Sequence, residues 1–182
     1  KKETSGKLKK RFGLEARQVI STFGLIGPGK GLELGIEAVA SISRTYPEVI
    51  YLILGRTHPM LIKHEGERYR HMLEAMVAER GIEANVQFVN KYLSDEELGQ
   101  YLYMSDIYLS PYPNQDQAVS GTMAFAIGCG RAIVSTPYSY ALEALADGRG
   151  LIASKADPRE LAELLERILT DPELKSQLQS KA

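Results

Sequence analysis

Residues 23–33 read FGLIGPGKGLE, and this stretch decides which fold the sequence predicts. From Gly24 to Lys30 it spells G-x-x-x-x-G-K, with an apolar run before it and an apolar helical pattern after it. A Walker A phosphate loop has this spacing but needs Ser or Thr after the lysine to hold Mg²⁺, and Gly31 occupies that position. The stretch is therefore either a phosphate loop built on a lysine and backbone amides, or a plain turn between a strand and a helix.

Apolar runs alternate with helical patterns along the rest of the chain. The runs predict strands at 19–24, 49–55, 86–89, 107–110, 132–135 and 151–153. The patterns predict helices at 31–46, 67–80, 94–104, 121–128, 140–146 and 157–170, and a last helix from residue 172. This alternation predicts an α/β fold: a doubly wound, mostly parallel six-stranded sheet with helices on both faces and strand order 3-2-1-4-5-6.

The composition indicates one globular domain and argues against some classes of partner. The chain has 182 residues, of which 44% are hydrophobic and 25% charged. A net charge of −1 argues against nucleic acid as a partner, and no apolar run is long enough to be an integral membrane segment. A single cysteine favours the cytoplasm, and the three histidines lack metal-ligand spacing, so neither a metal nor another cofactor is expected.

The first residues differ from the rest in being polar and basic. We assign residues 1–17 to a linker or short lead-in helix and residues 18–182 to the domain. The chain begins without Met, and we expect it to be a piece of a longer protein.

Ligands of such a sheet bind beyond the carboxyl ends of the strands, where the strand order reverses between strands 1 and 4. The loops at 27–31 and 110–122 lie there and run into helix N-termini, whose free amides and partial positive charge favour phosphate. Two such loops at one crevice predict a diphosphate site. The residues expected to hold it are Gly27, Gly29, Lys30, Ser120, Gly121 and Thr122. Each feature also has a structural explanation, since glycines form turns, lysines are often solvated and Ser120 can cap its helix.

A series of motifs spans the chain from about residue 19 to residue 170. After the first loop come LILG at 52–55, NVQFVNKYLSDEELGQYLYMSDIYLSPY at 85–112, GCGRAIVSTP at 128–137 and DPRELAELLERIL at 157–169. In this order they resemble the carboxyl-terminal, nucleotide-sugar-binding domain of retaining glycosyltransferases of the GT-B fold, glycosyltransferase family 4 or group 1 type. The resemblance implies the Rossmann-like half of a GT-B fold and an amino-terminal acceptor domain that is absent from this chain.

The resemblance also implies a reaction. A sugar passes from a nucleoside diphosphate sugar to a hydroxyl of a carbohydrate or lipid-linked acceptor, with retained configuration and without a metal. By the same resemblance Lys30 and Gln117 are the catalytic residues, with Lys30 on the phosphates and Gln117 on the donor sugar. Residues expected near the sugar or base are Lys91, Tyr92, Glu143 and Arg56.

The sequence departs from the family pattern at two places. The family's E-x7-E pair falls on Gln117 and Phe125, and an arginine of its first loop falls on Leu25, a loss for which Arg56 could compensate. An isolated donor domain is expected to be inactive. Two other functions stay open: a non-catalytic interaction or regulatory module with a vestigial phosphate site, and a nucleotide-sugar epimerase.

Overall fold

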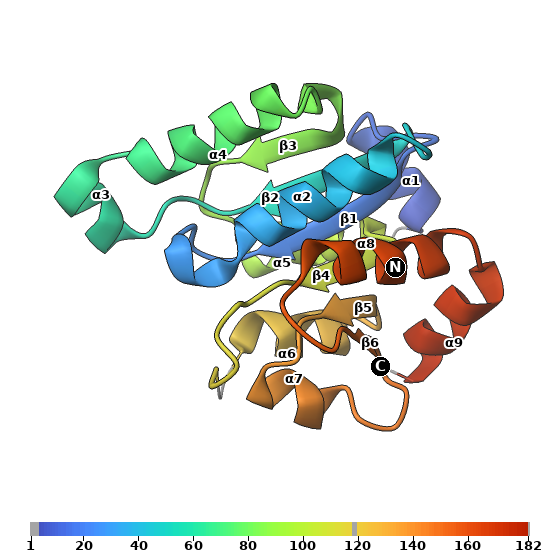
Figure 1. Ribbon diagram of the computed structural model, residues 1–182. Coiled ribbons are helices and arrows are strands. Elements are labelled where there is room, and N and C mark those ends of the chain that lie inside the picture. Colours follow the sequence, from blue (N-terminus) through green and yellow to red (C-terminus); the bar gives the residue numbers. More distant parts are fainter. Residues whose placement is uncertain (1–3, 118–119, 182) are drawn as a thin grey trace.

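Six parallel strands form one sheet in the order β3-β2-β1-β4-β5-β6 (Figure 1). The computed structural model describes residues 4–117 and 120–181. The strands are β1 Gln18–Phe23, β2 Val49–Leu54, β3 Val86–Val89, β4 Ile107–Ser110, β5 Ala132–Ser135 and β6 Leu151–Ile152. The predicted order 3-2-1-4-5-6 is therefore confirmed. The apolar runs agree with parallel strands, which are buried on both faces and so lack polar alternation.

Helices cover both faces of the sheet, which confirms the doubly wound prediction. One hydrophobic cluster joins the sheet to α2, α4, α8 and α9, and a second joins it to α1, α5, α6 and α7. None of the helices within residues 4–117 and 120–181 has the length and apolar character needed to cross a bilayer. The helices are α1 Ser5–Arg11, η1 Pro28–Lys30, α2 Leu32–Ser43, α3 Pro59–Glu65, α4 Arg68–Glu79, η2 Glu83–Asn85, α5 Asp95–Met104, α6 Gly121–Gly128, α7 Ser139–Ala144, α8 Pro158–Leu169 and α9 Pro172–Lys181.

Helix α1 lies within the stretch that the sequence assigned to a linker or short lead-in helix. Leu8 and Leu14 are only 2% and 6% exposed, and the Phe12 ring lies 4.9 Å from that of Tyr101 in α5. The many lysines and arginines in 1–17 hid these apolar positions, of which Phe12 and Leu14 lie just beyond the end of α1 at Arg11. The segment packs against the domain that it precedes.

Helix α3 was not predicted from the sequence. It begins at Pro59, where a proline is favourable, and the His58 imidazole caps it by accepting the Met60 N–H at 3.1 Å. None of its residues is buried, and Figure 1 shows it projecting from one end of the molecule. A short helix without a buried face leaves no apolar periodicity to detect.

A buried hydroxyl contact ties the centre of the sheet together directly below the first loop. The Thr22 Oγ1 of β1 lies 2.7 Å from the Tyr51 hydroxyl of β2 and donates to the Leu109 carbonyl of β4 at 2.6 Å. A Cβ at Gly35 of α2 would lie 2.6 Å from the Tyr51 hydroxyl, so this glycine lets the helix approach the sheet. The contact links β1, β2 and β4 across the middle of the sheet.

Candidate functional site

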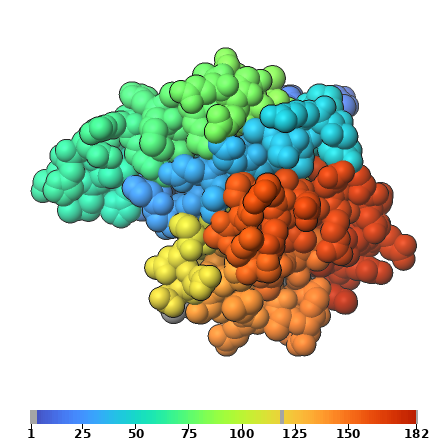
Figure 2. All heavy atoms as spheres, viewed as in Figure 1, coloured from blue at the N-terminus to red at the C-terminus, as the bar shows by residue number. Residues whose placement is uncertain are grey.

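The loops that follow β1 and β4 meet at the carboxyl edge of the sheet, as the strand order predicted. A Cβ at Gly31 would lie 1.9 Å from the Pro111 carbonyl oxygen, and Gly31 also has a φ of 69°. At the other end of the first loop, a Cβ at Gly24 would lie 3.4 Å from Cγ2 of Thr122 in α6. Figure 2 shows the surface hollowed at this edge, between the teal α3 segment and the yellow segment after β4.

The loop after β2 runs beside the first loop as a short extension of the sheet. Ile26 and Thr57 form a parallel bridge, in which the Ile26 N–H donates to the Arg56 carbonyl and the His58 N–H to the Ile26 carbonyl, both at 2.9 Å. A Cβ at Gly55 would lie 2.1 Å from the Gly24 carbonyl oxygen, so only glycine fits there. Three loops therefore converge, where the sequence had indicated two.

Other glycines at this edge are not required by packing. A Cβ at Gly27, Gly29 or Gly121 would meet no heavy atom within 4 Å, and none of these residues has a positive φ. Their backbone is consequently open to a ligand on the side where a side chain would stand. Gly31 and Gly55 differ from them, because neighbouring backbone leaves no room for a Cβ at either position.

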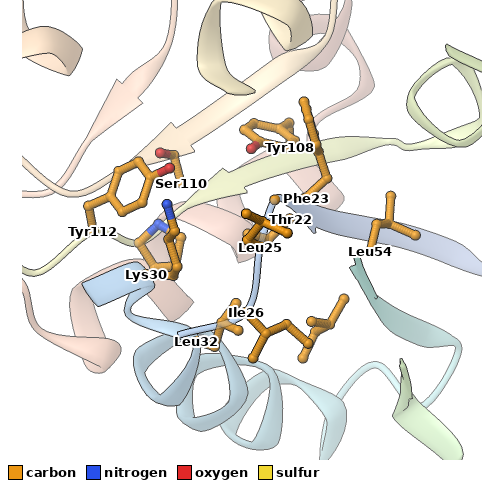
Figure 3. A pocket seen from close by; sticks show the side chains of 13 residues that line it. Thr22, Phe23, Leu25, Ile26, Lys30, Leu32, Leu54, Tyr108, Ser110 and Tyr112 are labelled. Atoms are coloured by element: carbon orange, nitrogen blue, oxygen red, sulfur yellow. The ribbon is translucent and has the colours of Figure 1, made fainter. Parts of the chain in front are cut away.

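Lys30 ends the 3-10 turn η1 and is half-buried between the two loops. Its ammonium lies 5.4 Å from the centre of the Tyr112 ring, and Figure 3 shows the two side chains next to each other, with Ser110 nearby. Within residues 4–117 and 120–181, no carboxylate forms an ion pair with Lys30. Its full positive charge therefore faces the cavity.

The hydroxyls at the start of α6 are engaged within the protein. The Ser120 Oγ, in a side chain only 4% exposed, accepts the Met123 N–H at 3.1 Å and caps the helix. The Thr122 Oγ1 lies 3.1 Å from the Ser120 Oγ and 3.3 Å from the Tyr112 hydroxyl. We expected these hydroxyls to face an anion, but the groups left for one are the first-turn amides of Gly121 and Thr122, which have no intrahelical acceptor.

Tyrosines support this helix end from below, a feature that the sequence did not specify. The Tyr138 hydroxyl lies 2.6 Å from the Ser110 Oγ, and its ring meets that of Tyr112 edge-on at 5.0 Å. Burial raises the pKa of Tyr138 to about 12, against the opposing effect of hydrogen bonds from Ser110 and Ser120. Tyr138 is wholly buried in the core.

Arg56, Lys91 and Tyr92 line one cavity of about 340 Å³, although they follow different strands. The Arg56 guanidinium lies 5.7 Å from the centre of the Tyr92 ring, which is 73% exposed. Lys91 donates to Glu97 at 3.1 Å, and this hydrogen bond raises the lysine's pKa. The structure thus gathers three of the four residues predicted near the sugar or base.

Gln117 and Glu143 are placed differently. Gln117 immediately precedes residues 118–119, which lie outside the described part of the chain, and its carbonyl accepts the Tyr140 N–H at 3.1 Å. Glu143 is exposed on α7 and does not line the cavity of Arg56 or that of Lys30. Phe125 stands at the second position of the family's glutamate pair. The centre of its ring lies 5.9 Å from that of Phe23, so this position makes an apolar contact.

Among the residues that the structure describes, no three His, Cys, Asp or Glu side chains are grouped so that they could hold a metal ion. Lys30, Arg56 and the free helix amides at the carboxyl edge suit an anionic ligand.

Comparisons with known proteins give the same fold. HepE of Anabaena, solved in complex with UDP and glucose, aligns with a TM-score of 0.85 at 20% identity over 97% of this chain and 45% of its own. The carboxyl-terminal domain of LpcC, a glycosyl transferase group 1 family protein of Francisella tularensis, aligns with a TM-score of 0.84 at 18% identity over 99% of this chain and 89% of its own. The chain therefore has the Rossmann-like architecture of one half of such proteins.

A curated relative and a family profile agree with the fold. The alpha-D-kanosaminyltransferase of Streptomyces kanamyceticus is 24% identical over 176 residues, which are 96% of this chain and 42% of that protein. The chain thus spans less than half the length of this relative. The profile of the family "Glycosyl transferases group 1" matches residues 6–182. A match over nearly the whole chain shows that it belongs to the group 1 glycosyltransferase family.

Proposed function

We propose that the chain is the donor-binding domain of a retaining glycosyltransferase, which transfers a sugar from a nucleoside diphosphate sugar to an acceptor hydroxyl. The observation that carries this proposal is the unpaired Lys30 beside open glycine backbone and the N-terminus of α6. These groups suit a diphosphate in size and charge. HepE was solved with UDP, which supports the same ligand class here.

The reaction breaks the bond between the sugar and its phosphate, and negative charge builds on the diphosphate that leaves. Lys30, the amides of the 27–31 loop and the first turn of α6 are fixed before the reaction and stabilise this charge as it develops. Gln117 orients the hydroxyls of the donor sugar. The acceptor hydroxyl attacks from the face that the diphosphate leaves, so the configuration at the sugar carbon is retained.

The proposed reaction needs no metal ion. A metal would neutralise the leaving diphosphate, and here a lysine and a helix N-terminus supply positive charge in the same place. The described part of the chain offers no cluster of carboxylates or imidazoles at this edge.

The nucleobase of the donor and the acceptor are also assigned to binding sites in this proposal. The apolar cavity behind Lys91 and Tyr92 takes the nucleobase, and its walls include Phe23, Leu54 and Leu93. A carbohydrate or lipid-linked acceptor is bound by an additional domain, since the curated relative is more than twice as long as this chain. We also propose that the protein is cytoplasmic, as the single cysteine led us to expect.

Calorimetry with UDP, GDP and ADP tests the donor site. We expect one of them to bind the wild-type protein, and Lys30→Ala to weaken that binding by about 1.5–3 kcal/mol, the value of a hydrogen bond to a charged group. Lys155→Ala is the matched control, because Lys155 is exposed and 4.0 Å from Asp157, far along the chain from the site. A folded wild-type protein that binds none of the three, or a Lys30→Ala variant that binds as the wild type does, would refute the proposal and favour a vestigial phosphate site.

A further inference from the structure

Arg56 and Leu25 occupy neighbouring positions on one face of the paired loops. The bridge between Ile26 and Thr57 sets the register, and their side chains are 1% and 0% exposed, so both point into the core. Side chains alternate between the two faces of an extended segment. The residues that precede them therefore both point outward, and Leu25 is 37% exposed beside the exposed Arg56.

Arg56 keeps its full charge at this position. Its guanidinium lies over the Tyr92 ring, and no carboxylate in residues 4–117 or 120–181 forms an ion pair with it. Lys91, in the same cavity, is neutralised by Glu97. An aromatic ring holds a cation in place without cancelling its charge, which leaves the guanidinium able to attract an anion.

Lys30 is held in the same way on the other side of the first loop. Its ammonium lies over the Tyr112 ring, and its cavity shares Phe23, Gly24, Leu25 and Leu54 with that of Arg56. Two uncompensated cations therefore flank the backbone of Gly24 and Leu25. A diphosphate carries more than one negative charge, and a planar guanidinium binds two phosphate oxygens at once.

We propose that Arg56 is a second phosphate ligand, which shares the donor's diphosphate with Lys30, and that Tyr92 is the positioning residue that holds its guanidinium at the cavity mouth. The proposal rests on the proposed function of the site. It assigns Arg56 to the phosphates of the donor and not to its base or sugar. The second cation of the site, Arg56, therefore comes from the loop after β2. It stands opposite Leu25 in the paired loops.

The test compares Arg56→Ala with the wild type in the full-length protein, using UDP, GDP and ADP and then the nucleoside of whichever diphosphate binds. Arg56→Ala should weaken diphosphate binding roughly 10- to 100-fold, the value of a charged hydrogen bond, and leave nucleoside binding unchanged. Arg68→Ala, an exposed arginine at the start of α4, is the matched control and should bind the diphosphate as the wild type does.

A charge swap makes the assignment sharper. Because Leu25 and Arg56 share one face, the double variant Leu25→Arg/Arg56→Leu should recover most of the diphosphate affinity that Arg56→Ala loses. Both side chains are on the surface, so the swap disturbs no core packing. For Tyr92, Phe should preserve diphosphate affinity and Ala should reduce it, with the thermal midpoint unchanged in both.

The outcomes separate this inference from the proposed function. An Arg56→Ala variant that keeps diphosphate affinity, or that loses nucleoside affinity equally, overturns the phosphate role while Lys30→Ala still reports on the donor site. A double variant that binds no better than Arg56→Ala also counts against it. If the folded wild-type protein binds none of the three diphosphates, the proposed function and this inference fail together.

Discussion

Two pairs of cations, one at each edge of the sheet, are held in different ways. At the amino edge, the Asp106 carboxylate before β4 pairs with Lys9 of α1 and Lys175 of α9, and it also accepts the Val19 N–H at 2.8 Å. At the carboxyl edge, Lys30 and Arg56 rest on aromatic rings and have no acidic partner in the described residues. The first arrangement holds terminal helices to the sheet, whereas the second leaves charge available to a ligand. A charged cluster therefore indicates a site only when its charges are not already neutralised.

The largest expected effect is at the amino edge. Asp106→Asn removes the charge that faces two lysines and should lower the free energy of unfolding by about 3–5 kcal/mol, because it leaves partly buried cations without a partner. Chemical denaturation measures this loss, with the exposed Glu163→Gln on α8 as the control. A loss below roughly 1 kcal/mol, the value of a surface ion pair, would show that the clamp contributes little.

The next comparison is between two glycines of the first loop. Gly31→Ala should destabilise the protein by about 2–4 kcal/mol, since it places a Cβ against the Pro111 carbonyl and disfavours the left-handed backbone. Gly29→Ala meets no atom and should change stability by less than about 0.5 kcal/mol while it weakens diphosphate binding. Thermal melts and calorimetry on both variants measure the two effects. If Gly29→Ala binds diphosphate like the wild type, the open backbone at this position does not contact the ligand.

A smaller effect is expected at the cap of α6. Ser120→Ala removes the acceptor of the Met123 N–H and should cost about 1 kcal/mol of stability. Ser120→Asp keeps an acceptor and should restore the cap, but its charge at the helix N-terminus should weaken the binding of a diphosphate. Equal diphosphate affinity in the Ala and Asp variants would place the anion away from this helix end.

The fold was predictable because most of its strands stand in the sequence as short, mainly apolar runs. β2 shows this well: all its residues, Val49–Leu54, are buried, and no polar residue interrupts them. Segments of mixed composition were harder, since α1 buries only Leu8 among seven mostly polar residues and α3 buries none. The hydrophobic pattern of a sequence reflects which residues are buried. Helices that bury few residues are therefore hard to predict from it.

The candidate site was predictable in location but not in detail. Strand order alone placed Lys30 and the start of α6 at one crevice, because both follow adjacent strands. The inward turn of the Ser120 hydroxyl and the position of Arg56 beside Leu25 depend on the rotamer of one side chain and on a bridge between two loops. The sequence therefore offered the Ser120 cap and a compensating role for Arg56 only as alternatives, because neither geometry has a period or spacing of its own.

The pH dependence of stability gives the most specific test of the amino-edge clamp. Burial alone would raise the pKa of Asp106, but hydrogen bonds from Lys175, Lys9 and the Val19 amide outweigh it and hold that pKa below the ordinary value of 3.8. A carboxyl with a lowered pKa in the folded state contributes stability above its unfolded pKa and loses it as pH falls through the folded one. Denaturation between about pH 5 and pH 2 should therefore show a loss of stability that Asp106→Asn lacks. Parallel curves for the two proteins over this range would mean that the clamp does not depend on the charge of Asp106.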